Sequence, residues 1–152
     1  MQVQEKNGNV DGWRPTHTEV YEWLKEQPLG VLSTLNEAGA PQSATVAFSV
    51  TEFGDLLVGT SEGSRKSQNI DHDSRVAFTI TDSERRITVQ IEGVARKLAQ
   101  VAFEMDYEAE HYKQRPESLP FKDEPGQCHI FITPQHVRFS DCRPKEWAIT
   151  EY

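Results

Sequence analysis

The sequence lacks the features that would tie the chain to a membrane or to export. No apolar run approaches the roughly 20 residues that a membrane-spanning helix needs, and the polar stretch Met1–Arg14 lacks the apolar core of a signal peptide. We therefore expect a cytoplasmic protein without a membrane partner. Cysteine is scarce as well: Cys128 and Cys142 form no C-x-x-C pair, which argues against a dithiol or zinc motif and favours two reduced, structural thiols.

Positive charge is also in short supply. The 152 residues include 24 acidic side chains against 16 lysines and arginines, which gives a formal net charge of −8. Such a surface repels nucleic acid and anionic lipid, and we find no basic stripe that would reverse this locally. The content of 36% hydrophobic and 26% charged residues suits one soluble domain with polar loops.

The N-terminal part of the sequence predicts a loose segment followed by a helix. Residues 1–15 are expected to be flexible, because they are polar and contain Gln, Asn and Gly. Thr16 and Glu19 have the spacing of a capping box, which predicts a helix start at this point. Pro28 ends the helix, since a proline disfavours the helical conformation in the residue before it.

The rest of the chain is dominated by strand patterns between short turns. Apolar or alternating runs occur at 30–35, 42–50, 56–61, 75–80 and 87–98, followed by a last pair at 128–133 and 136–140 around Pro134. Further helices are predicted at 63–71 and 100–114, and a loop with three prolines at 115–126. Because the early strands lack crossover helices, the pattern predicts a mainly β fold with flanking helices, built as a six-stranded antiparallel barrel.

Two further details complete the predicted domain. Gly93 lies inside the long strand, where a glycine is typical of a bulge or a sharp bend. We expect the barrel domain to span residues 16–141 and the tail 142–152 to be irregular.

The strand at 42–50 has two unlike faces. The apolar face consists of Ala44, Val46, Phe48 and Val50. The other face is small and partly hydroxylated, with Ser43, Thr45, Ala47 and Ser49. Small side chains leave room for a flat ligand against the strand, although an ordinary solvent-facing surface explains the same alternation.

The segment after the third strand carries an unusual charge pattern. The strand ends in two hydroxyl residues, Thr60 and Ser61, and a helix opens at Ser64. Arg65 and Lys66 then stand in the first turn of that helix. The sequence has neither a P-loop nor a G-x-G-x-x-G motif, so a nucleoside triphosphate or Rossmann site is not indicated.

Two cations at a helix N-terminus oppose the helix dipole, which favours acidic residues there. A phosphate group would relieve this repulsion, because it accepts hydrogen bonds from free backbone N–H groups, from hydroxyls and from both cations. The alternative is that Arg65 and Lys66 form a solvated pair on a surface helix. Spacing alone leaves both interpretations open.

Four stretches of the sequence together resemble the pyridoxamine 5′-phosphate oxidase-like superfamily of FMN-binding split-barrel proteins, in particular its small, general-stress-protein-type branch. They are Gly30–Leu35 with Ala40-Pro41-Gln42, Thr60–Lys66 with Asn69-Ile70 and Asp73–Val76, Val89–Ala95, and Phe131–Phe139. The resemblance covers about residues 16–140 and implies a six-stranded split β-barrel.

The resemblance further implies a homodimer with two flavin sites at the subunit interface. In that arrangement Arg65 and Lys66 hold the FMN phosphate, with the hydroxyls of Thr60, Ser61 and Ser64 beside it. The isoalloxazine ring lies along one strand and reaches a second one. The ring-lining residues implied are Thr45, Val46, Ala47 and Phe48 from the first strand, and Thr88 and Gln90 from the second.

The sequence departs from the true vitamin B6 oxidase at two points. The family's substrate-binding lysine matches a position near Ser49, and the C-terminal arginine–histidine motif is missing. We therefore expect an FMN-dependent oxidoreductase acting on another small molecule, with no catalytic side chain singled out. The alternatives are a split barrel that binds deazaflavin or haem, a non-catalytic flavin sensor or carrier, and a cofactor-free barrel used for assembly.

We predict no metal site from the sequence. The stretch Asp71-His72-Asp73 and the group Glu108, Glu110 and His111 contain metal-binding residue types. Neither has a two-ligand helical spacing that is supported by a third ligand elsewhere in the sequence.

Overall fold

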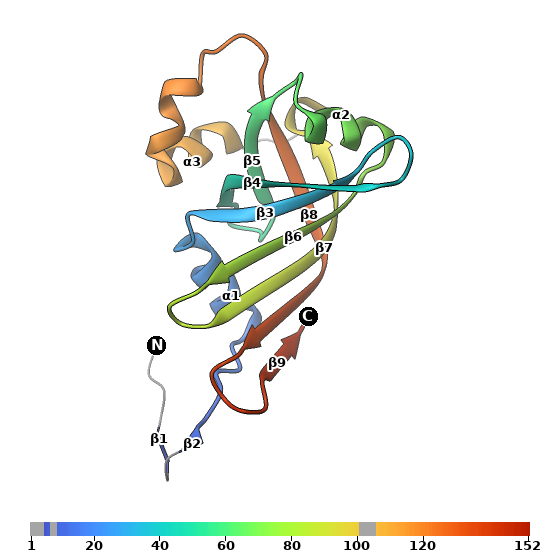
Figure 1. The fold of residues 1–152 in the computed structure, drawn as a ribbon. Helices are drawn as coiled ribbons and strands as arrows, with labels where there is room; N and C mark the ends of the chain where they lie inside the picture. The colour runs from blue at the N-terminus through green and yellow to red at the C-terminus, as the bar shows by residue number, and fades with distance from the viewer. Residues whose placement is uncertain (1–4, 7–8, 101–105) are drawn as a thin grey trace.

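The computed structural model describes residues 5–6, 9–100 and 106–152, and an antiparallel sheet dominates it (Figure 1). Seven strands form this sheet in the order β5-β4-β3-β6-β7-β8-β9. Their bounds are β3 Leu29–Leu35, β4 Pro41–Val50, β5 Leu56–Ser61, β6 Arg75–Asp82, β7 Ile87–Lys97, β8 Gln127–Asp141 and β9 Ala148–Glu151. Two short strands, β1 Glu5–Lys6 and β2 Asn9–Val10, pair separately.

Pairing between β5 and β8 closes the sheet into a barrel. The register of this pair runs from Leu56 opposite Ile132 to Ser61 opposite Gln127. Six strands, β3 to β8, therefore form the closed antiparallel barrel, and β9 is an extra strand outside it. The predicted fold class is confirmed.

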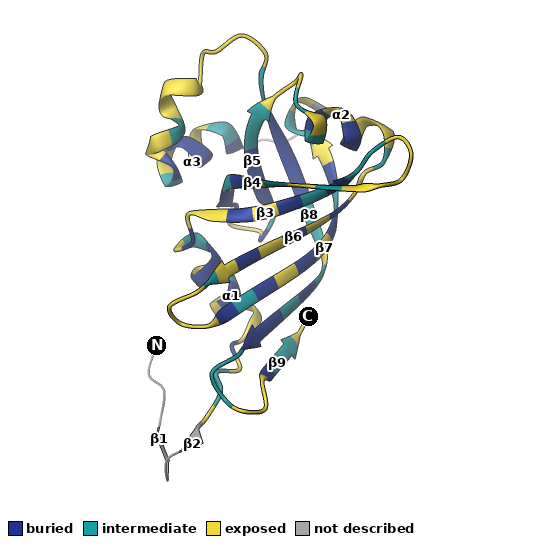
Figure 2. Ribbon diagram, in the orientation of Figure 1, coloured by how far each residue is buried: buried dark blue, intermediate teal, exposed yellow. Residues whose placement is uncertain are grey.

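The barrel is filled by the apolar face of each alternating strand (Figure 2). Phe48 and Phe78 meet in the interior, with ring centroids 5.1 Å apart and an interplanar angle of 87°. Such edge-to-face pairs add about 0.5–1.5 kcal/mol to the stabilisation from burial. The predicted apolar face of β4 lies inward: Val46, Phe48 and Val50 are all buried.

Within the described ranges, three α-helices and two 3-10 helices accompany the barrel. The α-helices are α1 His17–Lys25, α2 Arg65–His72 and α3 Tyr107–Gln114, and the 3-10 helices are Leu98–Gln100 and Pro116–Phe121. The predicted capping box of α1 is present, because Thr16 and Glu19 each accept a hydrogen bond from the other's backbone N–H. Of the predicted helix 100–114, residues 101–105 lie outside the described residues.

The predicted pair of final strands is wrong: β8 is one continuous strand of 15 residues. The pairing with β7 shifts at Glu92 and Gly93, since Glu92 faces His136 while Gly93 faces Pro134. The expected bulge at Gly93 is therefore present, and it lets a proline lie within the strand. Gly93 is required here, because a Cβ atom would lie 2.6 Å from the carbonyl oxygen of Thr133.

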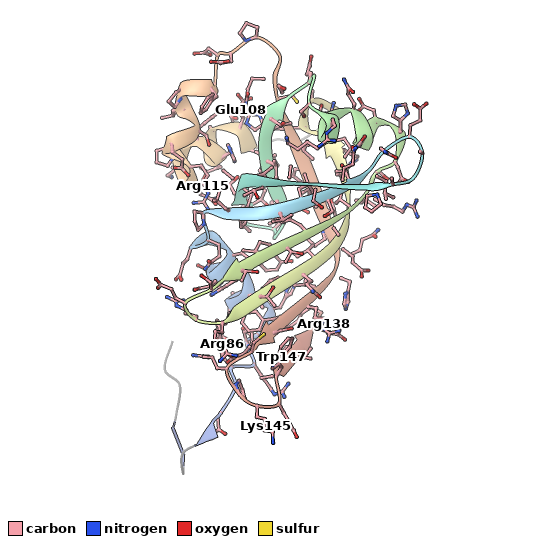
Figure 3. The ribbon with its side chains drawn as sticks, in the orientation of Figure 1. Arg86, Glu108, Arg115, Arg138, Lys145 and Trp147 are labelled. Atoms are coloured by element: carbon pink, nitrogen blue, oxygen red, sulfur yellow. The ribbon has the colours of Figure 1, made fainter. Side chains whose placement is uncertain are left out.

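The tail was expected to be irregular, but part of it pairs with β8 as β9. A buried carboxylate secures the start of this hairpin: Asp141 accepts hydrogen bonds from the Trp13 backbone N–H and from the Arg143 guanidinium. Trp147 lies in the turn before β9 and is 56% exposed (Figure 3). None of the described helices has the length and hydrophobicity of a membrane span.

Candidate functional site

The start of α2 is built as the sequence predicts. Ser64 is the N-cap residue, and its side chain accepts a hydrogen bond from the Ser67 backbone N–H at 3.3 Å. The hydroxyls of Ser64 and Thr60 are 3.0 Å apart and hydrogen-bonded, which fixes the strand-to-helix turn. No acidic residue occupies the first turn of α2.

Arg65 and Lys66 line a pocket between α2 and the hairpin of β3 and β4. The pocket has a volume of about 140 Å³ and is also lined by Leu32, Thr34, Gln42, Ser43 and Ala44. Among the described residues, neither cation forms an ion pair. The two side chains therefore bring uncompensated positive charge to a concave site in a chain with a net charge of −8.

A buried amide holds α2 against the hairpin. Asn69 donates hydrogen bonds to Thr34 Oγ1 and to Gln42 Oε1, each at 2.9 Å. Ser67 is fully buried on the same helix, and Ile70 packs into the barrel core. These contacts fix α2, and with it the two cations, relative to β3 and β4.

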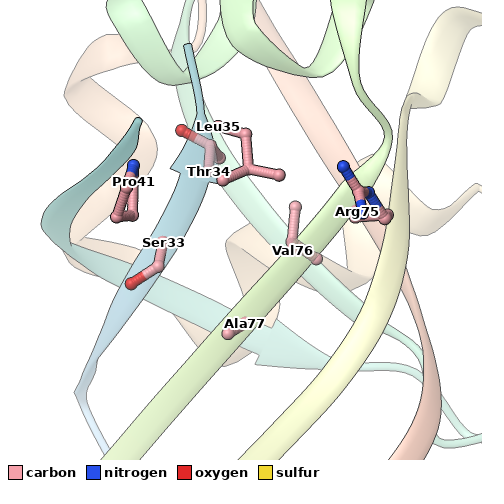
Figure 4. Close-up of a pocket in the computed structure, with 7 residues that line it drawn as sticks. All are labelled: Ser33, Thr34, Leu35, Pro41, Arg75, Val76 and Ala77. Carbon is pink, nitrogen blue, oxygen red and sulfur yellow. The ribbon is translucent and has the colours of Figure 1, made fainter. Parts of the chain in front are cut away.

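Figure 4 shows a second pocket. It adjoins the first, because Thr34 lines both. It has a volume of about 230 Å³ and is formed by β3, the start of β4 and the start of β6. Its cation, Arg75, is already paired: the guanidinium contacts the Asp73 carboxylate at 2.7 Å and holds the pKa of that carboxyl at about 2. Of the cations that line these two pockets, Arg65 and Lys66 are the ones without an ion pair to another described residue.

The outer surface of β3, β4 and β6 beside these pockets carries mainly small, hydroxylated or apolar side chains. Ser33 and Ser43 are hydrogen-bonded across β3 and β4 at 2.7 Å. Val31 pairs with Thr45 on one side and with Thr79 on the other, and Val31 is 38% exposed. We refer to the outward-facing residues of these three strands as the outer face: Leu29, Val31, Ser33, Ser43, Thr45, Ala47, Ala77 and Thr79.

The residues implied to line a flavin ring divide into three groups in the structure. Thr45 and Ala47 belong to the outer face. The side chains of Val46 and Phe48 are buried in the barrel core, so only their backbone atoms are available to a ligand outside. The two β7 residues Thr88 and Gln90 point outward from the barrel, opposite Thr81 and Thr79 of β6.

Of the hydroxyl residues predicted beside a phosphate, Ser64 and Thr60 are partly buried at the α2 turn and Ser61 is exposed. None of the three lines the pocket with Arg65 and Lys66. The pocket instead draws on Thr34 and Gln42, which sequence analysis did not single out. Thr34 and Gln42 reach the pocket because β3 and β4 pair and lie against α2, which are contacts between segments distant along the chain. The one local sign of such a contact was the stretch Asn69-Ile70, which follows the two cations.

A closed six-stranded barrel with one extra strand defines a split-barrel protein. Residues 16–140 match the family model described as pyridoxamine 5′-phosphate oxidase. The chain therefore belongs to the pyridoxamine 5′-phosphate oxidase family, as the sequence motifs indicated. No curated protein sequence matches the chain.

Solved structures with the same fold include three informative examples. A haem-binding protein from Mycobacterium smegmatis has a TM-score of 0.72 and 21% identity, over 91% of this chain and 59% of its own. General Stress Protein 26 from Bacillus anthracis has a TM-score of 0.64 and 24% identity, over 89% and 100%. A pyridoxamine 5′-phosphate oxidase-related FMN-binding protein from Nostoc punctiforme has a TM-score of 0.66 and 14% identity, over 93% and 99%. The chain thus spans less than two thirds of the mycobacterial protein.

Proposed function

We propose that the protein binds flavin mononucleotide and acts as a flavin-dependent oxidoreductase on a small molecule other than a B6 vitamer. The observation that carries this proposal is the pocket at the start of α2, where Arg65 and Lys66 lie without an acidic partner among the described residues. Its volume of about 140 Å³ is below the roughly 300 Å³ of sites that enclose drug-sized ligands. A phosphate group suits this space, with the rest of the cofactor lying outside it.

The residues present fit the phosphate of FMN. The first N–H groups of a helix lack intrahelical acceptors, and the N-terminal end of the helix dipole attracts an anion. Arg65 and Lys66 add charge-assisted hydrogen bonds, which are shorter and stronger than neutral ones. The protein residues would bind and orient the phosphate, and the bound flavin would supply the electron-transfer chemistry.

The outer face supports a place for the flavin ring. It begins beside the pocket and carries small or hydroxylated side chains such as Ser43, Thr45 and Ala47. A planar ring could lie there in van der Waals contact with the sheet. On a single chain, however, the other side of the ring would remain in water.

We further propose a homodimer in which a second copy covers the outer face. Leu29 is 51% exposed and Val31 38% exposed on this face, next to small residues and without charged neighbours on β3. A second copy would bury both side chains and enclose the ring. This would also exclude water from one side of the cofactor.

The direct test is the visible spectrum of the purified protein, combined with mass analysis of the released ligand. We expect an oxidised flavin spectrum, and tight binding when FMN is titrated into protein freed of its ligand. Arg65→Ala and Lys66→Ala should each weaken FMN binding about 10- to 100-fold, since a hydrogen bond to a charged group contributes roughly 1.5–3 kcal/mol. Arg85→Ala is the matched control, because Arg85 lies on the β6–β7 turn and pairs with Glu26 and Asp82.

Protein that stays colourless and fails to bind FMN would contradict the proposal. Reduction of bound flavin by NADH or NADPH, followed by reoxidation with a substrate, tests the oxidoreductase step separately. A flavoprotein that resists both donors would instead be a sensor or carrier. A deazaflavin would be identified by the mass of the released ligand.

Haem binding is the second candidate, and the fold shared with the mycobacterial haem-binding protein favours it. The same spectrum separates the two, because haem gives a strong Soret band and flavin does not. In a haem protein, the two cations would pair with propionates. Arg65→Ala would then weaken haem retention. Titration with FMN would show no binding to the wild type or to the variant.

A further inference from the structure

Two histidines are buried where helix α3 packs against strands β5 and β8 of the barrel. This region lies away from the proposed flavin pocket. His111 comes from α3 and is 1% exposed, and His129 comes from β8 and is 5% exposed. Their ring centroids are 5.2 Å apart with an interplanar angle of 70°. Burial lowers the pKa of both imidazoles, that of His111 to about 4, so both rings are neutral at neutral pH.

The Nε2 atoms of both rings face the same gap, above Gly59 of β5. A Cβ atom on Gly59 would lie 3.6 Å from His111 Nε2 and 3.7 Å from His129 Nε2. His129 Nε2 is fully buried and forms no hydrogen bond. A buried polar atom without a partner is costly, which indicates that something else contacts this nitrogen.

The other nitrogen of His111 is held by an outer hydrogen bond. His111 Nδ1 lies 2.7 Å from the Ser49 hydroxyl. We assign the proton to Nδ1, which then donates to Ser49 Oγ and leaves the Nε2 lone pair free. Histidines that bind metals have this arrangement, because the outer partner fixes both the tautomer and the orientation of the ring.

A cavity of about 450 Å³ lies against His129. Glu108 and Gln127 also line it, and further lining residues include Glu62 and the cations Lys97 and Lys122. Glu108, labelled in Figure 3, is three residues before His111 on α3. Residues at this spacing share a helix face. The Glu108 carboxylate is close enough to raise the pKa of His129 against the larger effect of burial.

We propose that His111 Nε2 and His129 Nε2 bind a divalent transition-metal ion of the zinc type, with Glu108 at the solvent side and water in the remaining positions. Neutral imidazole nitrogens and a carboxylate are common ligands for such ions. In the described parts of the chain, no group of three or more His, Cys, Asp or Glu side chains is already arranged to hold a metal ion. The site therefore consists of two preplaced imidazoles, and Glu108 closes on the ion when it binds.

The proposed metal site does not depend on the proposed flavin function. It includes a ligand, His129, that the sequence pattern did not reveal. On the sequence, Glu108 and His111 had no third ligand within reach. The fold provides His129, because β8 pairs with β5 beneath α3. Within the described residues, the flavin pocket and this cavity have no lining residue in common.

The test uses the protein as purified, treated with a chelator and titrated with Co²⁺ as a spectroscopic probe and with Zn²⁺. We expect one high-affinity site per chain. Bound Co²⁺ should show the d–d absorption of an ion with a low coordination number, and Zn²⁺ should raise the Tm. His129→Gln and His111→Gln should each weaken binding at least tenfold. His72→Gln is the matched control, because His72 is exposed at the end of α2. It should bind like the wild type.

Two further variants keep the test informative if a histidine variant unfolds. Gly59→Ala places a methyl group in the gap, 3.3 Å from Gln127 Nε2, 3.6 Å from His111 Nε2 and 3.7 Å from His129 Nε2. A small shift of the Gln127 side chain accommodates it, and the methyl group should weaken metal binding at least tenfold. Ser49→Ala should weaken it about 10- to 100-fold through the outer hydrogen bond. Failure of the wild-type protein to bind Co²⁺ or Zn²⁺ above the level of His129→Gln would overturn the proposal. Loss of binding in His72→Gln alone would do so as well.

Discussion

Asn69 on α2 donates a hydrogen bond to Thr34 on β3 at 2.9 Å, and both residues are almost completely buried. The same amide group also reaches Gln42 on β4. A helix start that carries two cations is thereby fixed over one hairpin of the barrel. The geometry of the proposed phosphate site therefore depends on this contact as well as on Arg65 and Lys66 themselves.

The first prediction tests that dependence with Asn69→Ala. The change removes two buried hydrogen bonds and leaves the Thr34 hydroxyl without its donor, which should destabilise the protein by about 1–3 kcal/mol. FMN affinity should fall about tenfold, because α2 loses its fixed position. Urea unfolding and FMN titration measure the two effects. Gln68→Ala on the exposed side of α2 is the control, and unchanged FMN affinity in Asn69→Ala would show that the contact does not position the site.

The second prediction concerns the outer face as a dimer interface. Val31→Glu places a charge in the middle of the exposed strand β3, and its burial in a dimer would be prohibitive. We expect a monomer by light scattering, together with loss of FMN binding. Phe53→Glu is the control, since Phe53 is 70% exposed in the turn between β4 and β5. A Val31→Glu variant that remains dimeric would place the interface elsewhere.

The third prediction concerns the bulge in the long strand. Gly93→Ala forces a Cβ atom to within 2.6 Å of a backbone carbonyl oxygen, and overpacking of this kind costs about 1–3 kcal/mol. Chemical denaturation should show this loss. Gly63→Ala should have little effect, because no atom lies within 4 Å of the added Cβ position. Equal stabilities of the two variants would contradict the role assigned to Gly93.

The fourth prediction is a pH dependence that originates at Asp141. Burial by itself raises the pKa of this carboxyl, but hydrogen bonds from Arg143 and from the Trp13 backbone N–H outweigh it and hold the pKa below 3.8. The folded state therefore binds the proton less tightly than the unfolded state. The stabilisation is complete above about pH 4 and is lost as the pH falls through the folded-state pKa.

Asp141→Asn tests this pH dependence. The variant should be less stable than the wild type by about 2 kcal/mol at pH 7, because hydrogen bonds to a charged group are lost. The difference should shrink as the pH drops below about 4. Urea unfolding across pH 2–7 measures it, and Glu146→Gln on the exposed turn serves as the control. A difference that is constant across this range would exclude Asp141 as the origin.

Local patterns in the sequence were sufficient wherever neighbours along the chain decide the structure. The capping box at Thr16 and Glu19 and the N-cap at Ser64 involve residues three positions apart. The alternation of β4 placed Val46 and Phe48 in the core. Pro134 predicted a break between two final strands, yet β8 continues through it. That outcome depends on the bulge opposite Gly93 in another strand, which periodicity in one segment does not reveal.

The barrel class, the family and the unusual pair of cations at a helix start could be predicted from residue patterns alone, because each is encoded by local periodicity or by short motifs. The folded chain was needed to show that Thr34 and Gln42 share a pocket with these cations, and that His111 meets His129 above Gly59. Those encounters join residues from separate strands and helices. They depend on how the sheet closes between β5 and β8, and pairing between strands that are distant along the chain leaves no signal in either strand alone.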